Sequence, residues 1–481
     1  FKIAVEDNGT GVPKSKVGQA FGKLLAGTKF SQRMQKRGQQ GIGVSYATLF
    51  AQITTGKPAR VKSSTGDGNI FECDVSVDVK KNEPVVANVR ETRGKFRGIR
   101  FEAEFAEIDY NRSEYSAYEY LRRTALANPH TQITLIEPNK EIIVFPRASK
   151  DIPKRAKQVL PHPLGITTSD LMDMASVTQA RKVSSFFTTE FARFSSDKVN
   201  EIKSLCPGID FEKHPKNFQW QEAEACVKAF QKVKWIAPDT STLVPIGGDQ
   251  ITKSLKNLLQ PEQMKVVERR PKVFRGGIPF SVEAAIAYGG KAGVHGESGG
   301  STKGEIMRFA NRVPLLFDAG NCAISEAVKS IDWGRYDLKN WEDMPVSIFI
   351  NFVSVYVPYT GAGKLAINAE AEIVEEIRFA LMECARDIAQ YIHGLQRASD
   401  QEERRMIFIR YIKEVAEAIH DISGKEKAIL VKKLEEMAKE KTALLEAGDK
   451  AEEEEEAEKI LEKLEESEEK GFKEEGESKE D

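Results

Sequence analysis

Three closely spaced glycines, Gly38, Gly41 and Gly43, separate a basic segment from an apolar run of helical character in KRGQQGIGVSYATLF, residues 36–50. Glycines at this spacing let successive backbone N–H groups converge, because no Cβ lies in the way. The helix that follows adds the positive end of its dipole. The segment therefore predicts a loop that binds phosphate groups.

A second glycine cluster lies upstream, in EDNGTGVP at residues 6–13. A buried Asp7 could accept a hydrogen bond from the amino group of a purine, and Gly9 and Gly11 would let the backbone lie against the flat base. An acid for the base and an amide-lined loop for the phosphates together predict an ATP site.

Two other glycine-rich nucleotide sites fail on spacing. The dinucleotide fingerprint G-x-G-x-x-G runs from strand into helix with an acid about twenty residues later, whereas here the order is G-x-x-G-x-G and the acid comes first. The P-loop needs G-x-x-x-x-G-K-[ST]. Around Gly363 and Lys364, Pro358 replaces the first glycine and Leu365 follows the lysine.

Length and charge limit the number of domains and the kinds of binding partner that the chain can have. A chain of 481 residues predicts two to four domains. Residues 449–481 contain 17 acids and 6 bases, so a net charge of −11 there leaves +9 on the rest of the chain. A modestly basic body with an acidic tail permits contact with nucleic acid.

Cysteine usage and hydropathy bear on the cellular compartment, on a zinc site and on a membrane span. The five cysteines include no C-x-x-C pair, which favours a reducing compartment and disfavours a zinc site. The longest apolar run, residues 346–357, contains Asn351 and two serines and reads as a strand rather than a membrane span. No signal peptide is evident, and the opening FKIAV reads as a strand already in progress, so we expect the sequence to start inside a domain.

The first third of the chain predicts a mixed α/β layer. Residues 1–6 read as a strand, 14–26 and 42–51 as helices, and 27–38 as a basic, mobile flap. Alternating segments between about 57 and 105 predict an antiparallel sheet with one covered face. A helix over 113–129, with a serine cap at its start and Asn128-Pro129 as its stop, precedes two strands that we expect to complete the layer.

The pattern then becomes helical. LPHPLGI at 160–166 predicts a stiff connector, and short helices follow up to about residue 235. Arg181, Lys182 and Arg193 in this insert are candidates for DNA phosphate contact, although a solvated helix face is the commoner role of such residues.

Strand signals return from about residue 238 and end in a glycine turn that contains Lys364. A strand, a glycine turn and a helix form half of a crossover unit, which predicts an α/β sandwich. The long helix over 370–398 has an apolar stripe, another amphipathic stretch follows at 402–419, and the chain ends in a Glu/Lys-rich segment predicted to be largely disordered. The stripe consists of Ile373, Ile377, Leu381, Cys384, Ile388, Ile392 and Leu395.

On these residues the chain resembles a known family, the B subunit of archaeal type IIB DNA topoisomerase (topoisomerase VI). DNGTGVP and RGQQGIGVS look like the two glycine boxes of the Bergerat (GHKL) ATPase superfamily. The resemblance covers about residues 1–420. Three further stretches are similar to the family's helix–two-turn–helix insert and transducer. They are PHPLGI at 161–166, RFANRVPLLFDAGN at 308–321 and VPYTGAGKLAI at 357–367.

The resemblance implies an α+β fold class: a partial Bergerat-type ATPase α/β sandwich, a helix–two-turn–helix insert, an α/β transducer domain and a helical, acidic C-terminal tail. The corresponding expected domains are 1–159, 160–237, 238–401 and 402–481. Lys364 would be the switch lysine that reaches the γ-phosphate. The residues that the resemblance assigns to ATP are Asp7, Gly9, Gly11, Thr28, Lys29, Arg37, Gly38, Gln39, Gln40, Gly41, Ile42, Gly43, Val44 and Lys364.

The resemblance also implies cofactors and partners. ATP and Mg²⁺ would be bound, and ATP would dimerise two copies into a gate that passes one DNA duplex through a break made by a separate A subunit, in an A2B2 assembly. The helices after about residue 370 would dock that subunit, and the expected location is cytoplasmic, at the nucleoid. The superfamily's general-base Glu and Mg²⁺-binding Asn belong to a helix ahead of Phe1, so this chain alone is expected not to hydrolyse ATP.

Two other hypotheses stay open at this point. One is a different ATP-driven clamp, chaperone-like or repair-like, although those families lack a helical insert at this position. The other is a non-catalytic binding module.

Overall fold

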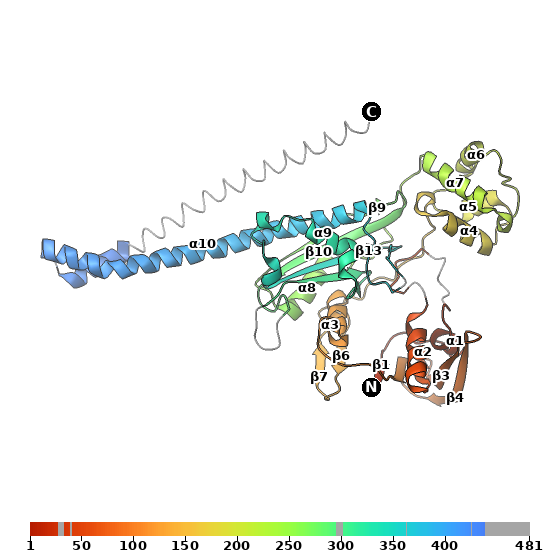
Figure 1. Cartoon of the computed structure of the whole chain (residues 1–481), viewed down its shortest axis with the longest axis horizontal. Helices are drawn as coiled ribbons and strands as arrows, with labels where there is room; N and C mark the ends of the chain where they lie inside the picture. The colour runs from red at the N-terminus through yellow and green to blue at the C-terminus, as the bar shows by residue number, and fades with distance from the viewer. Residues whose placement is uncertain (27–32, 39–40, 295–301, 362, 425, 438–481) are drawn as a thin grey trace. The chain divides into compact units, whose positions relative to one another are not determined.

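The computed structural model describes residues 1–26, 33–38, 41–294, 302–361, 363–424 and 426–437 (Figure 1). The chain forms two compact units, Phe1–Ile388 and Ala389–Asp481. Among the described residues, no helix is both long enough and apolar enough to cross a membrane.

The first sheet has five antiparallel strands in the order β1-β5-β2-β3-β4. Helices α1 (Lys14–Gly22) and α2 (Gly43–Thr55) pack on it. Cys73, Val75 and Val77 of β3 are buried in alternation with less buried neighbours, as a strand with one covered face requires. The predicted antiparallel sheet is confirmed. Its strands are β1 (Lys2–Glu6), β2 (Ala59–Ser64), β3 (Asn69–Asp78), β4 (Glu83–Arg93) and β5 (Gly98–Glu104).

The prediction for residues 113–147 is wrong in two respects. Strands β6 (Ile133–Ile136) and β7 (Ile142–Phe145) pair with each other in a separate hairpin instead of completing the first layer. Helix α3 (Ala117–Ala127) is capped by Ser116, whose Oγ accepts the Glu119 N–H at 3.2 Å, so it begins later than residue 113.

Helix α3 packs against α8 (Gly248–Leu259), far away in the sequence. Leu126 and Ala127 share a core cluster with Ile251 and Leu255, and the Ser254 hydroxyl donates to the Leu126 carbonyl at 2.8 Å. Helix α8 is not among the elements predicted from the sequence, although Ile251, Leu255 and Leu259 lie four residues apart and are almost fully buried. Apolar residues of two distant segments therefore bring α3 onto the second sheet.

The short helices predicted for the insert are confirmed (Figure 1). They surround a phenylalanine-rich core. Phe186, Phe187 and Phe230 are fully buried, and the Trp235 indole donates to the Phe230 carbonyl at 2.7 Å. The helices are α4 (Thr168–Val177), α5 (Val183–Glu190), α6 (Ser196–Leu205) and α7 (Trp220–Lys232).

The second sheet has the order β12-β11-β13-β10-β8, with β9 also paired to β10. β11 and β13 are parallel, and α9 (Ala323–Lys329) lies in the connection between them. β10 and β13 are buried along almost their whole length, as central strands covered on both faces should be. The strands are β8 (Gln263–Glu268), β9 (Lys272–Phe274), β10 (Ile278–Tyr288), β11 (Glu305–Ala310), β12 (Val313–Pro314) and β13 (Val346–Ser354).

Helix α10 (Ala371–Ser423) begins alongside this sheet (Figure 1). Its predicted apolar stripe is buried from Ile373 to Ile388, and the Cys384 thiol lies 3.7 Å from the Ala284 carbonyl oxygen of β10, whereas Leu395 is exposed. The sequence predicted a helix over 370–398 and a further amphipathic stretch at 402–419, and the structure joins the two in one continuous helix, Ala371–Ser423.

Candidate functional site

The first glycine loop is built on the edge of the first sheet. The Asp7 N–H donates to the Ile99 carbonyl at 2.9 Å, and Asp7 Oδ1 accepts the Gly9 N–H at 2.8 Å. Gly11 has a φ of +68°, and a Cβ there would lie 2.0 Å from the Ser64 carbonyl oxygen, so this position requires glycine. Asp7 is exposed, so the expectation that it is buried is wrong.

The second glycine loop leads directly into α2. Gly41 has a φ of +63°, Ile42 is the N-cap residue, and Gly43 is the first residue of the helix. Within the described part of the chain no side chain caps this N-terminus, so the first-turn amides of Gly43 and Val44 have no side-chain acceptor there. These amides fit the predicted role of binding phosphate oxygens.

The structure does not place every predicted ATP residue. Thr28, Lys29, Gln39 and Gln40 lie outside the described residues. Gly38 is described and exposed, and a Cβ there would meet no atom within 4 Å.

Residues 33–38, here called the strap, enter the second glycine loop and are held by the second sheet and its connections. The Gln35 side chain donates to the Val244 carbonyl at 2.9 Å and accepts the Val244 N–H at 2.7 Å. The Lys36 carbonyl accepts from Asn311 Nδ2 at 3.1 Å. The strap therefore connects the glycine loop mechanically to the turn between β11 and β12.

Arg37, at the end of the strap, is placed by α3. Its Nη2 donates to Oδ1 of Asn128, the C-cap residue of α3. Although the residue keeps access to solvent, burial of its guanidinium lowers the pKa of Arg37, and nearby Tyr120 opposes that shift. Arg37 is therefore a cation in a partly dehydrated position between the glycine loop and α3.

Lys364 lies on the turn after β13, in the left-handed conformation with a φ of +54°. Its N–H donates to the Gly361 carbonyl at 3.1 Å, its Nζ lies 5.9 Å from the centre of the Tyr359 ring, and burial lowers the pKa of its ammonium. Burial also raises the pKa of Tyr359, with a smaller contribution from Tyr120. Tyr120 contributes to the pKa shifts of both Arg37 and Tyr359. The role of Lys364 as the switch lysine stays a prediction.

Comparison with known proteins identifies the family. Residues 238–404 match the family model described as the topoisomerase VI B subunit transducer. The B subunit of type 2 DNA topoisomerase 6 from Pyrococcus furiosus is 42% identical over 471 residues, covering 88% of this chain and 81% of that protein. The chain belongs to the topoisomerase VI B subunit family. The corresponding protein from Methanothermobacter thermautotrophicus is 46% identical over 410 residues, covering 85% of this chain and 78% of that protein.

Family membership confirms the resemblance drawn from the glycine boxes and the three downstream stretches. It also indicates that the α+β fold consists of an ATPase sheet region and a transducer, the second sheet with its helices. Among the described residues, no three His, Cys, Asp or Glu side chains gather as metal ligands would.

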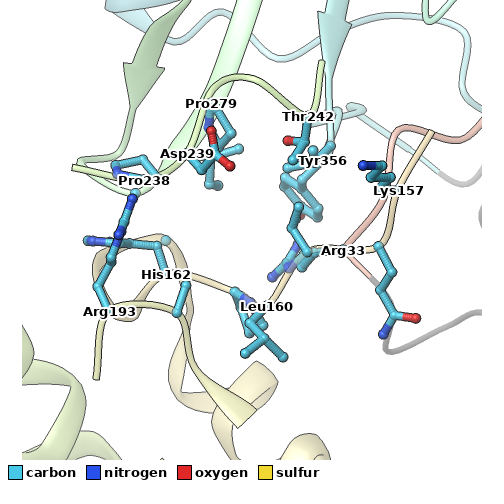
Figure 2. A pocket seen from close by; sticks show the side chains of 18 residues that line it. Arg33, Lys157, Leu160, His162, Arg193, Pro238, Asp239, Thr242, Pro279 and Tyr356 are labelled. Carbon is cyan, nitrogen blue, oxygen red and sulfur yellow. The ribbon is translucent and has the colours of Figure 1, made fainter. Parts of the chain in front are cut away.

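A cleft of about 420 Å³ lies elsewhere in the molecule, between the insert and the transducer (Figure 2). Arg33, Lys157 and Tyr356 line one part of it, and His162 and Arg193 line another. Its lining contains no residue of either glycine loop, so it is distinct from the predicted ATP site.

The candidate DNA-binding residues of the insert have different surroundings. Lys182 Nζ lies 2.8 Å from Glu212 Oε2, which offsets its charge, whereas Arg181 is exposed. Arg193 has a φ of +63° and lines the cleft. Contact of these residues with DNA stays a prediction.

His130, beside the C-terminus of α3, predicts a pH dependence of stability. Burial, followed by the charges of Arg312, Arg37 and Arg147, lowers its pKa from 6.5 to about 4. The folded chain therefore binds fewer protons than the unfolded chain between about pH 6.5 and 4, and stability falls as the pH falls through this window. Because the ring is partly exposed and solvent screens these charges, we expect the free energy of unfolding to drop by only about 1 kcal/mol from this group between pH 7 and 5.

Denaturant unfolding at pH 7 and pH 5 measures this drop. The His130→Gln variant should show a smaller difference between the two pH values than the wild type. An equal difference in both proteins would contradict the assignment to His130.

Proposed function

We propose that this chain is the ATP-binding subunit of a type IIB DNA topoisomerase, and that ATP closes two copies into a gate for a DNA duplex. The observation that carries the proposal is the hydrogen bond between the strap, which enters the second glycine loop, and the transducer: the Lys36 carbonyl accepts from Asn311 Nδ2 at 3.1 Å. Arg37 belongs to the strap, and Lys364 belongs to the transducer. A cation on each of two parts of the molecule could bind the same polyphosphate, so that the presence of its terminal phosphate would change how the two parts pack.

The proposed ATP site uses the groups already described. Asp7 would accept a hydrogen bond from the adenine amino group, Gly9 and Gly11 would shape that pocket, and the amides from Gly38 to Val44 would bind the phosphates. Thr28 and Lys29 would belong to a flap over the nucleotide. The uncapped N-terminus of α2 and the two cations fit a polyphosphate. Mg²⁺ would accompany the phosphates and offset part of their charge.

The domain division expected from the sequence forms part of the proposal. Residues 1–159 would bind ATP, 160–237 would form the insert, 238–401 the transducer, and 402–481 the C-terminal segment. The partners would be a cleavage subunit that carries the DNA-breaking chemistry, a second copy of this chain, and double-stranded DNA. The distal part of α10 would dock the cleavage subunit.

Relaxation of supercoiled DNA tests this function. The holoenzyme assembled with the family's A subunit should relax supercoiled DNA when ATP and Mg²⁺ are present and should be inactive without ATP. Light scattering should detect dimers of this chain on addition of a non-hydrolysable ATP analogue. A chain that binds no A subunit and supports no relaxation would contradict the proposal and favour a different ATP-driven clamp or a binding module.

A further inference from the structure

The turn between β11 and β12 contains a residue that its backbone disfavours. Ala310 pairs with Val313, so Asn311 and Arg312 alone make the turn, and both have a positive φ, +49° and +69°. Two-residue turns of this kind favour Asn-Gly, since glycine has no Cβ to strain the left-handed conformation. An arginine at the second position costs about 1–2 kcal/mol. We therefore expect the side chain of Arg312 to make interactions that offset the cost of this strain.

The Arg312 side chain is held in place almost out of contact with solvent. The residue is 7% exposed, its Nη2 donates to the Pro245 carbonyl at 2.7 Å, and its N–H donates to Asn351 Oδ1 at 3.1 Å. A single neighbour, Asn128, connects it to Arg37: Asn128 Nδ2 donates to the Arg312 carbonyl at 3.4 Å, and Asn128 Oδ1 accepts from the Arg37 guanidinium. Asn128 thus joins a transducer turn to the strap.

Positive charge gathers here without a matching acid. In the part of the chain that the structure describes, neither Arg37 nor Arg312 has a carboxylate within ion-pair distance. Burial lowers the pKa of Arg312, Glu283 opposes that shift, and Arg37 adds to it. The positive charges of both arginines also lower the pKa of His130, because they disfavour its protonated form.

Glu283, the acid that influences Arg312, is already used by other groups. It is fully buried, and its two oxygens accept the Gly247 N–H and the Asn351 Nδ2, each at 2.6 Å. Burial raises its pKa, which favours the neutral acid over a counter-ion. Two partly dehydrated guanidiniums that repel each other are stabilised when an oxyanion comes between them.

We propose that Arg37 and Arg312 form an oxyanion subsite that takes a phosphate group. One source of that group is the terminal phosphate of a nucleotide in the adjacent glycine loop, and this version rests on the proposed function. The other is free inorganic phosphate, which requires no nucleotide. In both versions Arg312 is a second transducer cation, separate from Lys364, and Asn128 positions the pair.

The Arg312→Gly variant tests the subsite without straining the turn, because it restores the favoured Asn-Gly pair. Arg275→Gly is the matched control: Arg275 also has a positive φ, +48°, in a tight turn of the same sheet, and its guanidinium pairs with Glu370. Arg37→Gln is the second variant, on the exposed side of the subsite, should Arg312→Gly fold poorly. The probes are ADP, a non-hydrolysable ATP analogue and inorganic phosphate, measured by calorimetry and by thermal shift at constant ionic strength.

We expect Arg312→Gly to bind the ATP analogue about 10–100-fold more weakly than the wild type, with ADP affinity unchanged within about twofold, since a hydrogen bond to a charged group contributes about 1.5–3 kcal/mol. Arg275→Gly should behave as the wild type. A loss confined to inorganic phosphate would also support the subsite and identify the free anion as its ligand.

Three results would overturn the subsite: wild-type affinity of Arg312→Gly for all three probes, an equal loss for ADP and the analogue, or no binding of any probe to the wild type. A wild-type chain that binds phosphate but no nucleotide would instead contradict the proposed function, and the effect of Arg312→Gly on phosphate would still decide the subsite.

Discussion

The Lys364→Ala variant should lose about 10–100-fold of ATP-driven DNA relaxation while the partner subunit can still cleave DNA. The ammonium is the transducer group proposed to reach the terminal phosphate, and a charge-assisted hydrogen bond of this kind contributes about 1.5–3 kcal/mol. Its half-buried position beside Tyr359 makes the charge costly without an anion, so we expect bound phosphate and the transducer position to be coupled. Relaxation of supercoiled plasmid by the holoenzyme, together with a separate cleavage assay, measures both parts of the prediction.

Lys140→Ala is a suitable control for that experiment. Lys140 is also a lysine with a positive φ, +70°, but it lies in the turn between β6 and β7 and is exposed. It therefore reproduces the strain of alanine in a left-handed position, about 1–2 kcal/mol, without touching the switch turn. Unchanged relaxation by Lys364→Ala would refute its role, and an equal loss in Lys140→Ala would reduce the effect to backbone strain.

The Phe187→Ala variant should destabilise the helical insert by about 3–5 kcal/mol, the usual cost of removing a buried aromatic ring. Phe187 is fully buried, and its ring centre lies 5.1 Å from that of Phe194 and 5.5 Å from that of Phe230. The vacated space is walled by other aromatic rings, which are too stiff to collapse into it. Denaturant unfolding followed by circular dichroism, with limited proteolysis to locate the cuts, measures the effect.

Trp220→Ala provides the comparison within the same insert. Trp220 is an aromatic residue of similar size, but 52% of it is exposed, so its removal should change stability by about 0.5 kcal/mol or less. A loss below about 1 kcal/mol in Phe187→Ala, or equal losses in the two variants, would show that the aromatic cluster does not hold the insert together.

Periodicity predicted those elements that have one covered face, whichever segment covers it. The alternation in β3, the stripe from Ile373 to Ile388 and the short helices of the insert all follow from one covered face per element. The glycine boxes indicated the ATPase superfamily, because their spacing meets a backbone requirement that few folds share, and three downstream stretches narrowed the resemblance to the family. Gly11 illustrates this: its positive φ and its contact with Ser64 exclude any other residue.

Contacts between segments that are distant in the chain could not be predicted from the sequence. Leu126 meets Ser254 across 128 positions, so α3 packs on the second sheet and the hairpin of β6 and β7 stands apart from the first. The motif predicted a buried Asp7, but the residue is exposed. Its burial depends on what covers the edge of the sheet, which the local sequence does not specify.

The sequence by itself indicated the class of the chain: two glycine loops with an acid predicted an ATP site, because backbone geometry at glycine is a local property, and the resemblance of these and three further stretches indicated the topoisomerase VI B family. The tertiary structure alone decided which charges meet. It linked the Arg312 turn to Arg37 through Asn128, and it placed the Lys364 ammonium 5.9 Å from the centre of the Tyr359 ring. Electrostatic coupling depends on distance and burial, and both are set by how remote segments pack.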